Sequence, residues 1–205
     1  MGPRGVLFEL TGGDRCLDLA NTVDGRPTDR PRELLRSYAD LVSWGEQAGA
    51  ITREEARSLR RMSGRRPSAA RGALERAILL REALFRIFSS ISRGSTPPVE
   101  ALNRLNTFLS GTLRRLRLVR SRRGFDLACA DGKTDLDRIS HAVARSAADL
   151  LIGGDLERIR QCAADTCAWL FLDTSRNRTR RWCDMSVCGN RSKARRHYER
   201  QRRGR

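Results

Sequence analysis

Residues 162 to 188 read CAADTCAWLFLDTSRNRTRRWCDMSVC, and this stretch holds four of the six cysteines of the 205-residue chain. The cysteines form two pairs, each with four residues between its members, and fifteen residues separate the pairs. Two pairs at about this separation are typical of a tetrahedral zinc site, in which each pair supplies two thiolates from a tight loop. The spacing therefore predicts one structural zinc ion, bound by Cys162, Cys167, Cys183 and Cys188.

A disulfide framework and a redox pair are the alternatives for these cysteines. The C-x-x-C motif of thiol–disulfide oxidoreductases is absent from the stretch. The N-terminus lacks the apolar region of a signal peptide, and no run of 18 apolar residues occurs, so we expect a cytoplasmic protein without membrane partners. In that reducing compartment, metal ligands and buried thiols are more common than disulfides. The two remaining cysteines, Cys16 and Cys129, lie in apolar settings and are expected to be core thiols.

The predicted zinc site is structural rather than catalytic, because four thiolate ligands leave no open coordination position. So small a module has almost no core of its own, and zinc would supply folding free energy on the order of 10 kcal/mol. Between the cysteine pairs, residues 169–172 (WLFL) are expected to form a strand, with a partner strand that starts near Trp182.

A strongly basic segment follows the second cysteine pair. Residues 176–205 contain twelve basic and two acidic residues, a balance of +10, within a chain of net charge +17. Only two of the 41 basic residues are lysines, so coding bias contributes to the arginine excess. Such charge indicates a polyanionic partner, either nucleic acid or an anionic membrane surface, and nucleic acid is the one we expect. The residues predicted to contact it lie on the final helix: Arg191, Lys193, Arg195, Arg196 and Arg200.

The first 150 residues are predicted to form a mostly helical α+β domain. Apolar residues at helical spacing indicate helices at about 16–23, 31–49, 52–61, 69–92, from 97 onward, and at 136–152. A loop is expected at 64–68, a short strand at 6–10, and a β-hairpin around the turn 121–124. The glycine pair 153–154 ends the last of these helices, and we predict a domain 1–153 followed by a zinc module 154–205.

Several short motifs resemble known families. The order F-L-D-T-S, R-R-W-C, C-G-N-R and K-A-R-R-H-Y between residues 171 and 198 resembles the CGNR zinc finger, whose name corresponds to residues 188–191 here. The segments CLDLANTV (16–23), ELL (33–35) and LVSW (41–44) resemble the ABATE domain. Together these resemblances imply a bacterial, stress-linked transcription regulator, in which the zinc finger binds DNA and the N-terminal domain is a candidate ligand sensor.

The leading hypothesis is therefore a zinc-containing, DNA-binding transcription regulator. The alternatives are an RNA- or ribosome-associated zinc-finger protein, and a small-molecule-binding domain with nonspecific affinity for nucleic acid. An enzyme is not expected, since the chain has two histidines and no P-loop, G-x-S-x-G or H-E-x-x-H motif. Asp18 and Asn21, in a polar cluster near the N-terminus, are candidate ligands for a small-molecule effector. A homo-oligomer is compatible with the sequence.

Overall fold

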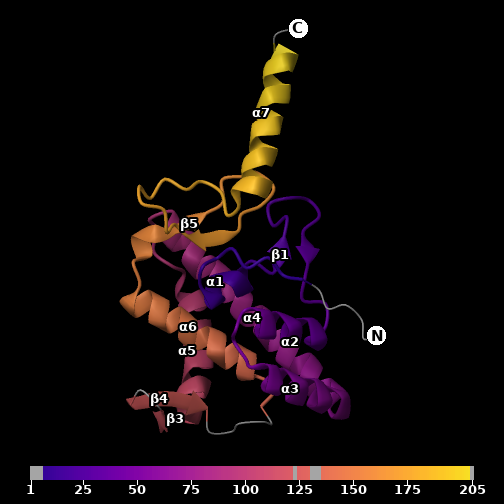
Figure 1. Cartoon of the computed structure of the whole chain (residues 1–205), viewed down its shortest axis with the longest axis vertical. Helices are drawn as coiled ribbons and strands as arrows, with labels where there is room; N and C mark the ends of the chain where they lie inside the picture. Colours follow the sequence, from indigo (N-terminus) through magenta and orange to yellow (C-terminus); the bar gives the residue numbers. More distant parts are fainter. Residues whose placement is uncertain (1–6, 122–123, 130–134, 204–205) are drawn as a thin grey trace.

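The long helix α4, Pro67–Ser92, runs through the middle of the chain's helical part (Figure 1). The structure is a computed structural model that describes residues 7–121, 124–129 and 135–203. Helix α4 buries a stripe that recurs every three to four residues and includes Ala73, Ala77, Leu80, Leu84 and Phe88. The small alanines allow neighbouring helices to approach closely, and each buried Leu or Phe contributes about 1.5–3 kcal/mol. The prediction of a central helix at 69–92 is confirmed.

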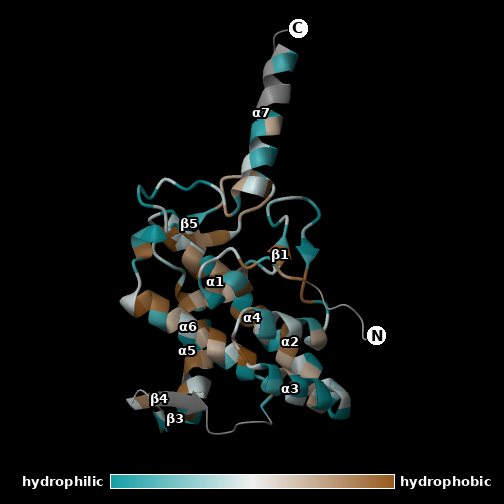
Figure 2. Ribbon diagram, viewed as in Figure 1, coloured by the Kyte–Doolittle hydropathy of each residue, from teal (hydrophilic) through white to brown (hydrophobic). Residues whose placement is uncertain are grey.

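Five more helices pack with α4 to form what we call the helical body. They are α1 (Arg15–Ala20), α2 (Tyr38–Gln47), α3 (Arg53–Arg65), α5 (Val99–Arg115) and α6 (Arg138–Gly153). A capping box starts α3, because Thr52 and Glu55 each accept a hydrogen bond from the other's backbone N–H. Figure 2 shows that hydrophobic residues gather inside the helical body.

Helix α2 begins later than predicted. Its N-cap is Ser37, whose side chain accepts from the Asp40 N–H. The preceding residues, expected to be helical, include strand β2 (Arg32–Glu33), which pairs antiparallel with β1 (Val23–Asp24). The carboxylate of Glu33 accepts from the Leu35 N–H at 2.8 Å and from Arg81 at 2.7 Å. These two hydrogen bonds hold the segment extended where periodicity alone predicts a helix.

Two other local predictions are wrong. The strand expected at 6–10 is absent from residues 7–10, and residue 6 lies outside the described residues. The loop expected at 64–68 shrinks to one residue, Arg66, because α3 continues to Arg65 and α4 starts at Pro67. Proline suits the first position of a helix, where the missing N–H leaves no hydrogen bond unmade.

The predicted β-hairpin is confirmed at one end of the molecule. Strands β3 (Leu116–Ser121) and β4 (Gly124–Cys129) pair antiparallel beyond the end of α5, opposite to the end from which the C-terminal helix projects (Figure 1). Of the two expected core thiols, Cys16 is fully buried, which confirms its prediction. The side chain of Cys129 lies outside the described residues.

The third hairpin joins the helical body to the region of the four cysteines. Strand β6 (Leu170–Leu172) lies within the strand predicted at 169–172, but its partner is β5 (Ile159–Gln161) and not a strand starting near Trp182. Alternate residues of a strand point to opposite faces. Leu170 is accordingly buried in the core of the helical body, whereas Phe171 is buried among the cysteines. The division into domains 1–153 and 154–205 stays a prediction.

Candidate metal centre and basic helix

The four cysteine sulfurs lie close enough together to coordinate one ion. All four Sγ atoms are within 4.8 Å of one another, and the Cys167–Cys183 and Cys183–Cys188 pairs are 3.6 and 3.7 Å apart. A tetrahedral site with zinc–sulfur bonds of about 2.3 Å requires sulfurs about 3.8 Å apart. Each cysteine is at most 6% exposed. The cluster therefore matches a closed zinc site in number, spacing and burial.

Two loops position the four sulfurs. In the first, the Cys162 N–H donates to the Trp169 carbonyl at 2.7 Å and the Cys167 N–H donates to the Ala164 carbonyl at 3.0 Å, which closes a tight turn. Ala168 follows with φ of 64°, in the left-handed region, and the chain then enters β6. These contacts account for a gap of four residues between the first two ligands.

The second loop is a single π-helical turn, Met185–Gly189, which contains the fourth cysteine. Asp184 caps this turn, since its carboxylate accepts from the N–H groups of Ser186 and Val187 at 2.6 and 3.0 Å. The chain continues directly into α7 (Asn190–Arg203), so Cys188 stands immediately before the basic helix. The prediction that the second pair leads into a helix is confirmed.

The thiols can all ionise only with a cation among them. Hydrogen bonds from Cys167 and Cys183 lower the pKa of Cys162 to about 2. The hydrogen bond to Cys162 in turn raises the pKa of Cys167 and of Cys183, and burial raises that of Cys188. Cys162 thus ionises readily, while the other three thiols keep their protons more tightly. A divalent metal removes this restriction, because its charge stabilises several thiolates together.

Around the cysteines lies a small core of aromatic residues. Trp169 and Phe171 are buried against the cluster, and Trp182 packs on it. The Arg180 guanidinium stacks over the Phe171 ring at 4.6 Å and donates to the carbonyls of Trp182 and Cys183. Buried Asp173 accepts from the N–H groups of Ser175 and Arg180 at 3.0 and 2.8 Å. These contacts order the long segment between the cysteine pairs.

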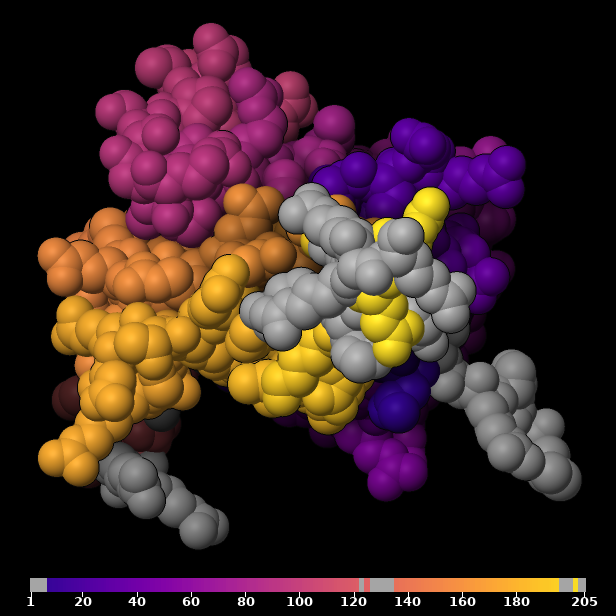
Figure 3. Space-filling model, turned by 90° about the horizontal axis from the view of Figure 1, so that it is seen from above, coloured from indigo at the N-terminus to yellow at the C-terminus, as the bar shows by residue number. Residues whose placement is uncertain are grey.

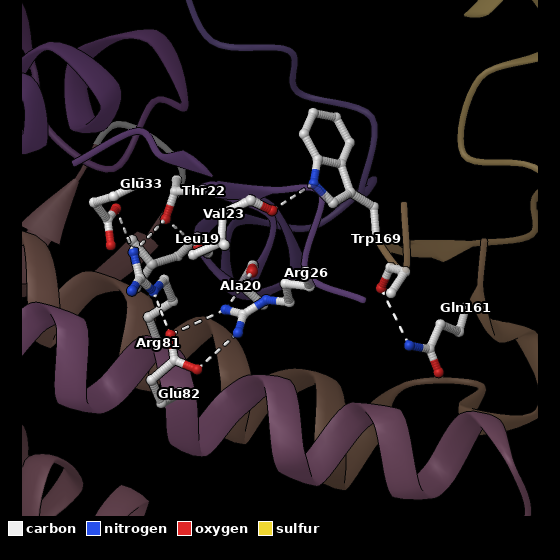
Figure 4. A network of polar contacts seen from close by, with 11 residues as sticks. Leu19, Ala20, Thr22, Val23, Arg26, Glu33, Arg81, Glu82, Gln161 and Trp169 are labelled. Atoms are coloured by element: carbon white, nitrogen blue, oxygen red, sulfur yellow. Dashed lines mark hydrogen bonds and ion pairs between the residues drawn. The ribbon is translucent and has the colours of Figure 1, made fainter. Parts of the chain in front are cut away.

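A junction of hydrogen bonds ties residues 159–189, which we call the zinc module from here on, to the N-terminal segment around α1. The Asn21 side chain donates to the Leu170 carbonyl and accepts from the Leu170 N–H, both at 2.8 Å. The Trp169 indole donates to the Val23 carbonyl at 2.9 Å (Figure 4), and the Leu172 N–H donates to the Gly12 carbonyl at 2.8 Å. Asn21 is only 2% exposed. Its side chain pairs with both backbone groups of Leu170, as a residue of a neighbouring strand would.

Asp18, the other candidate for an effector site, also has a backbone partner. Its carboxylate accepts from the Gly12 N–H at 2.7 Å, and burial raises its pKa to about 6. A Cβ atom at Gly12 would lie 2.8 Å from that carboxylate and 2.9 Å from the Asp18 nitrogen, so the turn requires glycine. An effector-binding role for Asp18 and Asn21 stays a prediction; both side chains form hydrogen bonds within the protein, to Gly12 and to Leu170.

An ionic network, which sequence reasoning missed, ties β2 and the loop before it to α4. Arg81 of α4 is 4% exposed and pairs with Glu33 and Glu82, each at 2.7 Å (Figure 4). Arg26 pairs with Glu82 at 2.7 Å and lies 4.1 Å above the Phe85 ring. Burial is tolerated here because each guanidinium is paired and hydrogen-bonded. The arginine-rich composition concealed these residues among many exposed cations.

Helix α7 projects from the zinc module and away from the helical body (Figure 1). Seen from above, it stands where the module meets N-terminal residues (Figure 3). Arg191, Lys193 and Arg195 are exposed. The backbone of residues 196 and 200 belongs to α7, whereas the side chains of Arg196 and Arg200 lie outside the described residues.

Two contacts attach the first turns of α7 to the loop between Cys162 and Cys167. Arg191 donates to the Thr166 hydroxyl at 3.2 Å, and Arg195 forms an ion pair with Asp165. Asp173 is bonded within its own loop and not to Arg191. Val187 and Ala194 are exposed, and the Tyr198 side chain lies outside the described residues.

Comparison with protein families gives two matches that together span most of the chain. Residues 13–154, more than half of the chain, match the model named ABATE, "Putative stress-induced transcription regulator". The chain belongs to the ABATE family. Residues 158–201 of this ABATE protein match the CGNR zinc finger. With the four-cysteine geometry, this match assigns the site to one structural zinc ion. No curated protein matches the chain in sequence.

The ABATE protein has no described helix that is both long and apolar enough to cross a membrane. Of its two histidines, His141 is buried between α5 and α6, more than twenty residues from the nearest zinc ligand in sequence. The side chain of His197 lies outside the described residues. When bound, zinc supplies the positive charge and tetrahedral bonding that hold the two loops together.

Proposed function

We propose that this ABATE protein is a DNA-binding transcription regulator in which α7 is the main contact with DNA. The observation that supports this proposal best is the exposure of Arg191, Lys193 and Arg195 on a helix that begins directly after a zinc ligand. A helix of 14 residues is about 21 Å long and has a width that fits the major groove. We further propose that the protein acts in the bacterial cytoplasm under stress, without catalysing a reaction.

The zinc module would determine the direction of the helix. The contacts from Thr166 to Arg191 and from Asp165 to Arg195 bind the first turns of α7 to a loop that carries two zinc ligands. Most of the affinity would come from phosphate contacts, and a minority of the arginines would reach base edges. Because Asp165 already pairs with Arg195, part of the charge of that arginine is neutralised within the protein.

The salt dependence of DNA binding tests this proposal. In a plot of the logarithm of the DNA-binding constant against the logarithm of the salt concentration, the slope should be about −0.9 for each phosphate neutralised. Arg195→Ala combined with Arg196→Ala should make the slope shallower by about one to two units, since Asp165 neutralises part of the Arg195 charge, while the zinc content stays unchanged. The matched control removes Arg57 and Arg104, two exposed arginines of the helical body, and should leave the slope unaltered.

An unaltered slope in the α7 variant would exclude this helix as the nucleic-acid surface. Competition between duplex DNA, structured RNA and single strands separates the proposal from its alternative. Preferential competition by structured RNA would identify an RNA- or ribosome-associated protein, in which Trp182 becomes a candidate for base stacking. Equal competition by all three nucleic acids would leave only nonspecific affinity and contradict a regulatory role.

A further inference from the structure

A cavity of about 280 Å³ lies in the helical body, away from the zinc module. Its wall is formed by α6, by the N-terminal end of α1, by the end of α5 and by the turn that follows α2. Three arginines line it, Arg15, Arg138 and Arg145, against a single acidic residue, Asp149. We call it the arginine cavity.

The arginines differ in how far the protein already neutralises them. Arg138 forms an ion pair with Glu55. Arg145 meets Asp149 at 3.5 Å, and the Asp149 side chain is 68% exposed, so this pair is weak. Arg15 is exposed and has no hydrogen-bond or ion-pair partner in the described part of the chain. Two cations on different helices therefore face one space, where Asp149 and Asp14 are the nearby carboxylates and Asp14 is already hydrogen-bonded to Ser146 and to the Cys16 N–H.

The inner wall of the arginine cavity is polar and ordered. His141 and Thr112 are 8% and 4% exposed. The Thr112 hydroxyl donates to the Phe108 carbonyl at 2.8 Å, so at 3.0 Å it must accept from Nδ1–H of His141. The Nε2 atom lies 3.1 Å from the Arg115 guanidinium and 3.3 Å from the Asp135 carboxylate. Both ring nitrogens thus contact polar groups of the protein. His141 is therefore an ordered part of the cavity wall and not a free base or metal ligand.

We propose that the arginine cavity binds a small organic anion, whose carboxylate or phosphate group lies between Arg15 of α1 and Arg145 of α6. Guanidinium groups bind both anions through paired hydrogen bonds. Ala50, Leu116 and Ala142 line the same cavity and would contact the carbon skeleton. The volume is at the lower end for ligand pockets, which favours a short dicarboxylate or a sugar-sized phosphate ester over a nucleotide.

Calorimetric titration of the full-length, zinc-loaded protein tests this proposal. The probes are succinate, glycerol 3-phosphate and inorganic phosphate, with glycerol as the neutral counterpart and sodium chloride used to match ionic strength. At least one anion should bind with a Kd below about 1 mM. The double variant Arg15→Gln/Arg145→Gln should weaken that binding at least about tenfold, because it removes both cations but keeps a polar side chain at each position.

The control Arg57→Gln/Arg104→Gln removes the same charge from exposed positions outside the cavity and should bind as the natural protein does. If the cavity variant fails to fold, Asp149→Asn gives a second test, since removing the acidic residue should tighten binding about threefold. The proposal is overturned if none of the three anions binds, if the two double variants lose affinity equally, or if Asp149→Asn weakens binding. Because no arm of this experiment uses nucleic acid, its outcome is independent of the DNA proposal.

Discussion

Asn21 connects two regions that lie far apart in the sequence, since its side chain bonds both backbone groups of Leu170, 149 positions away. In the sequence it is one of several polar residues in the segment CLDLANTV, and its position suits a helix cap and a ligand-binding residue equally well. No local pattern reveals a partner at that distance. The zinc ligands, in contrast, were predictable because their spacing is itself the signal.

Replacing Asn21 by alanine should lower the free energy of unfolding by about 2–6 kcal/mol. The variant leaves a buried N–H and a buried carbonyl of Leu170 without partners, and each such loss costs about 1–3 kcal/mol. Urea denaturation of the zinc-loaded protein measures the change. Asn103→Ala, at an exposed position of α5, is the control and should cost less than about 0.5 kcal/mol. Equal losses in both variants would argue against the role of Asn21 at the junction.

The raised pKa of Asp18 makes its contribution to stability dependent on pH. In the folded protein the pKa is about 6, above its ordinary value of 3.8, so the folded state holds the proton more tightly. This contribution is fully present below about pH 4 and is lost as the pH rises through 6. Asn in place of Asp18 mimics the protonated side chain at every pH.

The stability of Asp18→Asn relative to the natural protein should therefore rise between pH 4 and pH 7, by on the order of 3 kcal/mol. Denaturation of both proteins across this range measures the difference, and any loss of zinc at acid pH affects the two alike. A difference that stays constant with pH would show that the Asp18 carboxyl keeps an ordinary pKa.

At the scale of elements, helices were predictable where periodicity and end signals agree. Helices α3, α4 and α6 have both, although the boundary between α3 and α4 was predicted wrongly. Periodicity failed at residues 31–37, where Glu33 binds Arg81 of a distant helix and keeps the chain extended. Strand β5 was missed because Ile159-Arg160-Gln161 contains only one apolar residue. Its stability depends on pairing with β6 and on burial of Ile159 in the helical body, neither of which is encoded locally.

Two substitutions at the first turn of α7 can separate a role of Arg191 in stabilising the zinc module from a role in binding DNA. Thr166→Val removes the acceptor of Arg191 and keeps every charge, whereas Arg191→Ala removes the donor and the charge. Both variants should lower the stability of the zinc-loaded protein by about 0.5–1 kcal/mol, which corresponds to a melting temperature lower by about 2 °C. Only Arg191→Ala should reduce the salt slope of DNA binding, by about one unit.

If Thr166→Val changes the salt slope as much as Arg191→Ala does, Arg191 acts through the position of the helix and not by touching DNA. If neither variant changes stability, the contact between Arg191 and Thr166 contributes nothing to the module.

In the whole molecule, the helical body should fold without zinc but be less stable without the zinc module. A chain that ends at Gly154 keeps the buried stripes of α4 and α6. It loses Ile159 and Leu170 from its core and leaves Asn21 without its partner. We expect this fragment to unfold cooperatively, at a lower temperature than the zinc-loaded protein, and with no response to a chelator. Calorimetry with and without chelator checks each point.

The full-length protein should respond differently to the same chelator. Loss of zinc would release the two cysteine loops and with them β6, so the unfolding temperature should approach that of the fragment. The double variant Cys183→Ser/Cys188→Ser should behave like the chelated protein and contain no zinc. A fragment that responds to chelator, or a full-length protein that does not, would contradict a boundary at residues 153–154.

Strand β6 presents Leu170 to one core and Phe171 to the other, and this alternation has a consequence for how the protein can evolve. A three-residue segment that serves two cores cannot be optimised for either one alone. A finger taken from another protein would bring a strand shaped for a different neighbour, so recombination at the glycine pair would join surfaces that do not match. Substitutions in α1 and in β6 should therefore be inherited as compensating pairs, and the two regions should be exchanged between lineages only together.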